Sequence, residues 1–111
     1  MREFNTAPLE VRKTVSQDFQ THPYECGWAS EAIFFIHVEE MAGENAQLTA
    51  TVELSNDGIH WIPDGTRSEI ISSKGLHLIK ATHFGGWLRL DCSVAGEHAQ
   101  FRLNIQLALK G

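Results

Sequence analysis

The stretch that decides the fold is AGENAQLTATVEL at residues 42–54, because nearly the same string returns as AGEHAQFRLNIQL at residues 95–107. The two copies begin 53 positions apart, at Ala42 and at Ala95. They keep Ala, Gly, Glu, Ala and Gln in register and then continue with residues of similar polar or apolar character. The second half of the chain therefore repeats part of the first.

Both copies continue with apolar residues at every second position, which is typical of a strand with one face in a core and one in water. In the first copy Leu48, Ala50 and Val52 alternate with polar residues. In residues 99–110 the apolar set is longer: Phe101, Leu103, Ile105, Leu107 and Leu109. Residues 87–94 alternate in the same way. We therefore predict three strands from these segments.

The segment SEAIFFIHVEEM at residues 30–41 fits two structures. Ser30 could cap a helix that Gly43 ends. The repeat aligns the segment with residues 87–94, however, and the alternation there favours a strand. As a strand it is apolar on both faces, with Phe34, Ile36 and Val38 on one side and Ile33 and Phe35 on the other. A strand of this kind is either covered by a neighbouring segment or placed at a subunit contact.

Weaker patterns predict further strands at residues 9–15, 59–62 and 75–82, and a short edge strand at 68–72. The turn signal Ser-Asn-Asp-Gly at residues 55–58 precedes the second of these.

We interpret each copy of the repeat as a β-hairpin, with AGExAQ as the polar turn and Gly43 or Gly96 at the reversal. Two such hairpins can bury their apolar faces against each other. The predicted fold is all-β, an antiparallel β-sandwich that is jelly-roll-like, with about seven or eight strands and an internally duplicated hairpin. One domain spans residues 1–111, and residues 1–29 are expected to form an arm or to cover a sheet edge.

The layout of residues 30–111 resembles small all-β proteins found in bacteriophage and prophage structural-gene neighbourhoods. The resemblance rests on a pattern, S-x-DG-x-x-W followed by an aromatic-Gly-x-aromatic-hydrophobic-Arg strand. The matching residues here are Ser55, Asp57, Gly58, Trp61, Phe84, Gly85, Trp87, Leu88 and Arg89. The resemblance implies a non-enzymatic component of a particle or tail. The first thirty residues depart from the pattern.

Composition narrows the classes of function. A net charge of -5 opposes binding to nucleic acid, which depends on Lys and Arg neutralising phosphates. The longest apolar run, residues 32–36, is far too short to span a bilayer, and the amino terminus has no apolar stretch typical of an export signal. We expect no membrane partner, and a location in the cytoplasm or in a particle. The two cysteines do not suggest a disulfide framework.

These observations favour a structural protein that associates with itself or docks on a larger protein assembly. The candidate interface residues are Ile33, Phe35, Trp87, Arg89, Leu9 and Val11. For Trp87 two interpretations stay open: an exposed interface hot spot, or a side chain covered by the 84–86 loop or by the amino-terminal segment.

The alternative function is a module that binds carbohydrate or another small ligand through loop residues, namely Asp57, His60, Trp61 and Trp28. Against this, Trp61 could simply fold back onto the core. Self-assembly predicts an extended apolar patch around Ile33, Phe35 and Trp87. Ligand binding predicts a concave cleft lined by aromatic residues at one end of the sandwich.

No catalytic or metal-binding pattern stands out. Ser55, Asp57 and His60 are the residue types of a catalytic triad, but they come without a nucleophile elbow or an oxyanion segment. The six histidines form no cluster with metal-ligand spacing. Cys92 falls in the apolar phase of its strand and is expected to be a buried thiol, whereas the sequence leaves Cys26 open. We therefore predict no enzyme activity, no cofactor and no metal.

Overall fold

The computed structural model describes residues 4–82, 84 and 86–111, and these residues contain strands and connections but no helix. The seven strands agree with the predicted all-β class and strand number. They are β1 (Phe4–Val15), β2 (Phe19–Gln20), β3 (Tyr24–Glu25), β4 (Glu31–Ser55), β5 (Ile62–Arg67), β6 (Gly75–Thr82) and β7 (Trp87–Lys110).

Hydrogen bonds join these described strands into a single antiparallel sheet, where an antiparallel, jelly-roll-like sandwich was expected. The order is β1-β7-β4-β5, with β2 and β3 also paired to β7 and β6 paired to β4. The centre of the sheet is the pair β4 and β7, which runs from Glu31 opposite Lys110 to Ser55 opposite Trp87. Every other strand lies beside one of these two.

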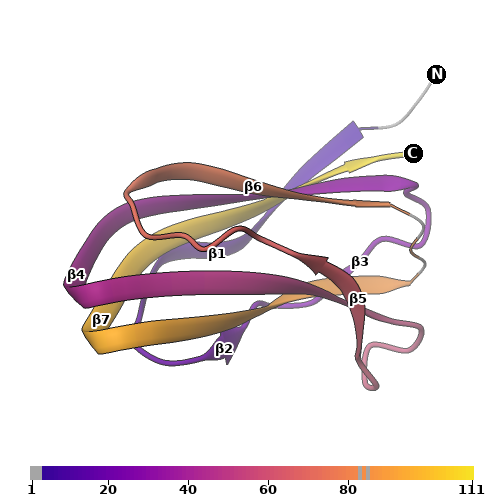
Figure 1. The fold of residues 1–111 in the computed structure, drawn as a ribbon. Helices are drawn as coiled ribbons and strands as arrows, with labels where there is room; N and C mark the ends of the chain where they lie inside the picture. Colours follow the sequence, from indigo (N-terminus) through magenta and orange to yellow (C-terminus); the bar gives the residue numbers. More distant parts are fainter. Residues whose placement is uncertain (1–3, 83, 85) are drawn as a thin grey trace.

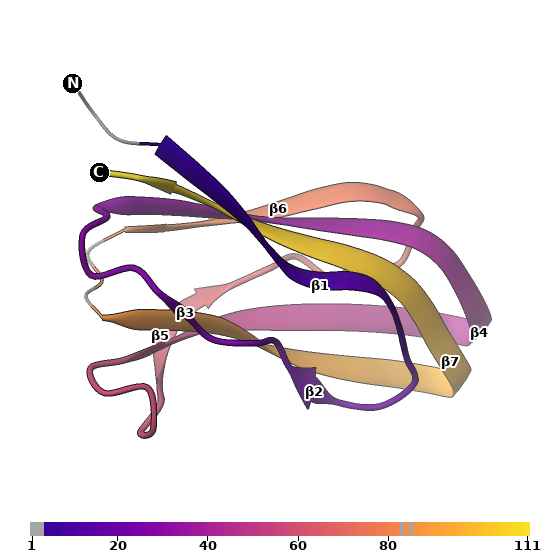
Figure 2. The same ribbon diagram turned by 180° about the vertical axis from the view of Figure 1, so that it is seen from behind.

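The sheet folds back on itself where β4 and β7 bend sharply, at the left of Figure 1. Its two halves then face each other, as the reverse view in Figure 2 also shows. We call one the β6 half: β6, the first part of β4, the second part of β7, and β1. The other, the β5 half, contains β5, the second part of β4, the first part of β7, and β2 and β3.

The repeated motif forms this bend, and both copies have the same backbone conformation. Gly43 and Gly96 have φ angles of 100° and 114°, and two residues later Asn45 and His98 have φ angles of 52° and 56°. A Cβ at Gly43 would lie 2.5 Å from the carbonyl oxygen of His98, and a Cβ at Gly96 would lie 2.7 Å from that of Asn45. Each glycine thus makes room for the backbone of the other copy, which only Gly allows at such an approach.

A local twofold axis relates the two copies and passes between them at the pair formed by Glu44 and Glu97. The pairing of the strands obeys this symmetry on both sides of the axis: Phe34 opposite Leu107 corresponds to Leu54 opposite Leu88. One register shift, between Val38 and Glu40, interrupts the correspondence. Glu39 is the extra residue, so β4 carries a bulge that β7 lacks.

The hairpin interpretation of the repeat is therefore wrong. AGExA reverses no strand. It bends one continuous strand in each copy, and β4 and β7 pair edge to edge along their whole length. The two copies pair with each other only at the motif, around Glu44 and Glu97, and beyond it their strands lie in opposite halves of the fold. The alternation on either side of the motif is compatible with a turn or with a bend, so the sequence pattern alone did not separate the two.

The strand prediction for residues 30–41 is confirmed, and the helical alternative is excluded, because this segment is the first part of β4. The strand predicted at 59–62 begins only at Ile62. The edge strand predicted at 68–72 is reduced to a single bridge between Ile71 and Leu48. Two short strands, β2 and β3, were not predicted. Together with β1 they pair residues from 4–25 with β7.

The core lies between the two halves and is built from the inward residues of both. Fully buried side chains come from the β6 half and from the β5 half alike; the largest are Phe34, Phe101, Ile36, Leu48, Leu88, Leu90, Leu103, Ile105, Leu107, Leu109, Val38 and Val52. Burying a side chain of this size contributes about 1.5–3 kcal/mol, so this set provides the main stabilisation of the fold.

Candidate functional site

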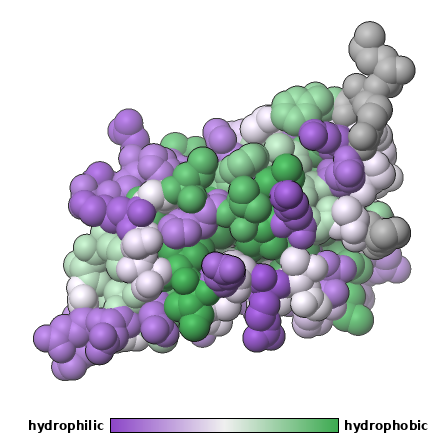
Figure 3. All heavy atoms as spheres, turned by 45° about the horizontal axis from the view of Figure 1, so that its top comes forward, coloured by the Kyte–Doolittle hydropathy of each residue, from purple (hydrophilic) through white to green (hydrophobic). Residues whose placement is uncertain are grey.

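The most distinctive surface of the molecule is the solvent face of the β6 half. Phe35 of β4 lies opposite Leu78 of β6, and one step along the strands His37 lies opposite Leu76. Leu76 and Leu78 are 65% and 53% exposed, although both are large apolar side chains. Figure 3 tilts the top of Figure 1 toward the viewer and shows hydrophobic side chains gathered in the middle of the molecule.

We call the residues Ile33, Phe35, Leu76, Leu78 and Val11 the outer apolar face. Ile33 and Phe35 point outward because the strand alternates and Phe34 and Ile36 are buried on the other side. Val11 projects from an irregular part of β1, between two register shifts, and is 66% exposed. Asn104 and Gln106 of β7 lie between Phe35 and Val11, so the apolar surface is continuous only over β4 and β6. Contiguous exposed apolar surface marks interaction sites in soluble proteins.

A hollow of about 350 Å³ indents the outer apolar face. Its lining combines apolar and polar side chains: Pro8, Glu10, Val11, Phe35, His37, Leu76, Asn104 and Gln106. Asn104 is held in place, because its Oδ1 accepts a hydrogen bond from the Arg12 backbone at 2.8 Å and its Nδ2 donates one to Glu39 at 2.9 Å. The orientation of this one lining side chain is therefore fixed.

The predicted interface residues do not all share this surface. Ile33, Phe35 and Val11 do, but Leu9 is 6% exposed and belongs to the core. Leu9 is two residues after the buried Ala7, so ordinary alternation turns it inward, and the register shifts that follow Pro8 take Val11 out of this phase. Its nomination as an interface residue is wrong.

Trp87 and Arg89 lie on the solvent face of the other half of the sheet. A Cβ on Gly58 would be 3.2 Å from the Trp87 ring, so the 55–58 turn partly covers this side chain. The Arg89 guanidinium lies 4.2 Å from the centroid of the Trp61 ring, and its Nε is 2.7 Å from Glu53. Both residues thus have partners within the chain, and they form no common patch with Ile33 and Phe35.

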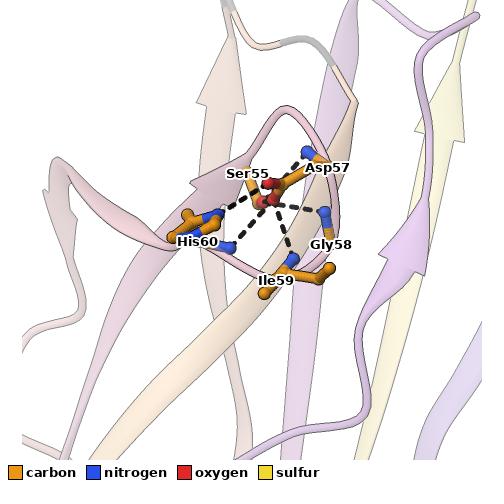
Figure 4. A network of polar contacts seen from close by, with 5 residues as sticks. All are labelled: Ser55, Asp57, Gly58, Ile59 and His60. Carbon is orange, nitrogen blue, oxygen red and sulfur yellow. Dashed lines mark hydrogen bonds and ion pairs between the residues drawn. The ribbon is translucent and has the colours of Figure 1, made fainter.

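The loop residues named for ligand binding are occupied with one another. The Ser55 hydroxyl donates to Asp57 at 2.9 Å and accepts from the backbone N–H of Gly58 at 2.8 Å. Asp57 also accepts from the N–H groups of Ile59 and His60, and its second oxygen is 2.7 Å from the His60 ring (Figure 4). The His60 N–H, the His60 ring and the Ile59 N–H hold the pKa of Asp57 well below its usual range. This network fixes the turn.

The arrangement of Ser55, Asp57 and His60 differs from that of a catalytic triad. In a triad the serine hydroxyl bonds to the histidine, which the carboxylate orients from behind. Here Ser55 bonds to Asp57 and is 1% exposed. The hydroxyl thus donates to a carboxylate of lowered pKa, which is a weak base, and not to the histidine that activates the nucleophile of a triad.

Four hollows among the described residues lie elsewhere on the molecule, and none of these four is lined by Trp28, Asp57, His60 or Trp61. Trp28 is 41% exposed in the connection before β4. Trp61 does not fold onto the core, as it could have done, but lies over Arg89. The use of these residues in ligand binding stays a prediction.

The two thiols are free and fully buried. Burial, reinforced by nearby carboxylates, raises the pKa of Cys26 and that of Cys92 to about 12. A thiol held neutral is a poor nucleophile. Within the described part of the chain no group of three or more His, Cys, Asp or Glu side chains is placed to hold a metal ion. His83 lies outside the described residues.

Comparison with known proteins gives a likeness of fold only. No family model matches the chain. No curated protein matches it in sequence either. Among solved structures, the chain is similar to the crystal structure of the SPBc2 prophage-derived protein YomS, with a TM-score of 0.61 and 7% sequence identity. The match covers 100% of this chain and 96% of that one. The shared architecture thus extends over the whole chain, and a phage-derived protein has it.

Sequence reasoning found Ile33 and Phe35 but missed Leu76 and Leu78 as part of the same surface. The signal was present, because residues 76–81 place Leu76 and Leu78 in the opposite phase to the buried Ile79 and Ala81. What the sequence did not reveal is that β6 pairs with β4 and sets Leu78 beside Phe35. Among the described residues, no helix is long and apolar enough to cross a bilayer.

Proposed function

We propose that this protein is a non-enzymatic structural subunit that associates with copies of itself, and in this way enters a larger, phage-type protein assembly. The observation that supports this function best is the outer apolar face, on which the exposed Leu76 and Leu78 lie beside the half-buried Phe35. Isolating such surface from water is a general driving force for association. The fold likeness to a prophage-derived protein fits the same role.

The proposal also covers the rigidity of the molecule, its cofactors, its partners and its location. The folded sheet would serve as a rigid, sandwich-like unit, needing no cofactor and no metal. Its partners would be protein, without nucleic acid or membrane, and it would work in the cytoplasm or within a particle. The ligand-binding alternative has less support, because Asp57 and His60 satisfy each other and Trp61 is stacked on Arg89.

Molar mass in solution, measured by light scattering over a wide range of concentrations, tests this function. We expect the mass to rise above the 12.4 kDa of one chain as concentration increases. Leu78→Asp places a charge within the outer apolar face and should raise the dissociation constant at least tenfold, a change of about 1.4 kcal/mol.

Ile59→Asp is the matched control. Ile59 is 75% exposed, but it lies in the turn before β5, away from the outer apolar face. The Ile59→Asp substitution should therefore leave the dissociation constant of self-association unchanged. A mass of one chain for the unmodified protein at every concentration would overturn the proposed function.

A further inference from the structure

We propose that two copies stack the β4 and β6 parts of their outer apolar faces about an intermolecular twofold axis that runs along the strands, so that β6 of each copy lies over β4 of the other. This inference rests on the proposed function and specifies its geometry. It commits to a second copy of this chain as the occupant of the face. Three features of the β6 half support it: its blocked edges, the position of its apolar side chains, and the sorting of its outward charges by strand.

Both edges of the β6 half are poorly suited to pairing with a strand of another copy. At one edge, β1 contains Pro8, which has no backbone N–H, and its register shifts twice between Pro8 and Lys13. At the other edge, the connection from Thr66 to Ser73 runs beside β6. In addition, β6 contains Lys80, and lysine on an edge strand commonly prevents such pairing. A copy that associates with this half should therefore contact its outward face.

The outward apolar side chains of this half are concentrated on two neighbouring strands. Ile33 and Phe35 lie on β4, and Leu76 and Leu78 lie on β6 beside them. The adjoining stretch of β7 is polar on this side, since Gln106 lies opposite Phe35. A stack that buries the apolar side chains is therefore centred between β4 and β6.

The strip formed by β4 and β6 is small. Two strands at about 4.8 Å each span about 10 Å, and the eight residues of β6 extend about 26 Å at roughly 3.3 Å per residue. Each copy would bury about 260 Å², and the pair about 500 Å², an area typical of weak and transient contacts. Self-association through this strip should therefore require a high protein concentration.

The outward charges of the strip are sorted by strand. Residues 31–40 of β4 contain three acidic side chains and no lysine or arginine; the acidic residues are Glu31, Glu39 and Glu40. In contrast, β6 and the residue before it contain Lys74 and Lys80 and no acidic side chain. One strand of the strip is thus acidic and the other basic.

Within one copy the carboxylates near the bend already have cations beside them. Arg102 lies 3.8 Å from Glu39 and 3.9 Å from Glu40, and Lys74 lies 3.7 Å from Glu40. These neighbours stay in place when two copies stack, so the charges provide little extra affinity. Complementary charge fixes orientation more than it adds affinity, and the sorting by strand decides which strands of the two copies can face each other.

A twofold axis in the plane of contact can run across the strands or along them. An axis across the strands places β4 on β4 and β6 on β6, with the strand direction reversed. Glu31 then meets Glu40 of the other copy, and Lys80 comes close to Lys74. Like charges would oppose each other at both ends of the strip, which is unfavourable.

An axis along the strands places β6 on β4 and keeps each residue at the same level of the strip. Lys74 then lies over Glu40 of the other copy, and Leu78 lies over Phe35, each twice by symmetry. Unlike charges and apolar side chains thus meet in a single arrangement. It is isologous, so it closes as a dimer.

Cross-linking through introduced cysteines tests the direction of the axis, because Lys74 and Thr82 are about 26 Å apart along the strand. With the axis along the strands, each of these positions lies roughly 10–15 Å from its own counterpart in the other copy, one sheet spacing away. With the axis across the strands, the two distances between counterparts add up to about 52 Å along the strands, so at least one of them is about 26 Å or more.

We therefore expect a short bismaleimide to cross-link Lys74→Cys with itself and also Thr82→Cys with itself, each giving a band at twice the chain mass. The native thiols are fully buried and should not react. Ile59→Cys, in the turn before β5, controls for random collision.

Charge reversal gives an independent readout by light scattering. In the proposed stack Glu40 faces Lys74, so Glu40→Lys should raise the dissociation constant about fivefold. With the axis across the strands Glu40 would face Glu31, and the same substitution would lower the dissociation constant. Lys74→Glu combined with Glu40→Lys in one chain should restore the original value, because each facing pair again joins opposite charges.

The outcomes separate this inference from the proposed function. If the unmodified protein associates, cross-linking at only one of the two positions or at neither, or a lower dissociation constant for Glu40→Lys, would overturn the stack and leave the function standing. A protein that stays monomeric would overturn both.

Discussion

The two halves of the folded sheet have the same arrangement of backbone, but the side chains that they present to solvent differ in character. The local twofold axis makes their central strands equivalent, and the inward residues are apolar in both. Outward, the β6 half exposes Leu76 and Leu78, whereas the β5 half carries Arg89 against Glu53 and Trp61. The duplicated motif thus accounts for the shared backbone, and the proposed function depends on the outward residues that differ between the halves.

The first part of β4 has apolar residues on its inward face and on its outward face. Phe34 is fully buried in the core, and its neighbour Phe35 lies on the outer apolar face. Where most strands of an antiparallel sheet alternate apolar with polar residues, the first part of β4 is apolar on both sides. The first part of β4 thus contributes to the core on one side and to the proposed contact surface on the other.

The largest effect should come from exchanging these two neighbours for alanine. Phe34→Ala removes a fully buried ring and should cost about 3–5 kcal/mol of unfolding free energy. Phe35→Ala should cost less than about 1 kcal/mol but weaken self-association. Urea unfolding at a low protein concentration, paired with light scattering, measures both. Equal losses of stability would show that Phe35 is a core residue and would remove the distinction between the two sides of β4.

The next effect tests the twofold relation at the bend. Gly43→Ala and Gly96→Ala each combine a positive φ with a Cβ that meets backbone of the other copy, and each should cost about 2–3 kcal/mol. The two losses should agree within about 0.5 kcal/mol. Gly65→Ala is the control, since Gly65 has a φ of 93° but nothing within 4 Å of a Cβ, so it should cost only the backbone strain. A large difference between the first two variants would contradict the symmetry.

A smaller effect concerns Cys92, which the twofold relation places at the position of Val38: Val38 opposite Leu103 corresponds to Ala50 opposite Cys92. Cys92→Val should therefore change the unfolding free energy at neutral pH by less than about 1.5 kcal/mol.

The contribution of the Cys92 thiol to stability can be read from how the unfolding free energy of Cys92→Val and of the unmodified protein depends on pH. Burial raises the pKa of Cys92 from 9.0 to about 12, so the folded state resists ionisation of the thiol. The stability that this thiol contributes is present below about pH 9 and is lost as the pH rises toward 12. The unmodified protein should lose more stability over this range than Cys92→Val, in which Cys26 is the one thiol left to ionise. Identical alkaline profiles in denaturant titrations would show that Cys92 is not held neutral by burial.

The sequence predicted the strands well and their partners poorly, for a physical reason. Alternation reports which side of a strand is buried, and Phe101, Leu103 and Ile105 are buried as predicted. It does not report whether AGExA turns the chain or bends it, because both need Gly with a positive φ. Register and bulges depend on neighbouring strands, which explains why Leu9 and Val11 were wrongly assigned to one surface and why Leu76 and Leu78 were overlooked.

Side-chain accessibility of the two halves, compared between dilute and concentrated protein, tests most directly whether association uses the outer apolar face. Hydroxyl-radical footprinting with mass spectrometry reads this at Phe35, Leu76 and Leu78 in one half and at Trp61 and Trp87 in the other. We predict that labelling of the first set falls as concentration rises, while labelling of the second set stays constant. A fall confined to Trp61 and Trp87, or equal in both halves, would contradict the assignment of the contact surface to the β6 half.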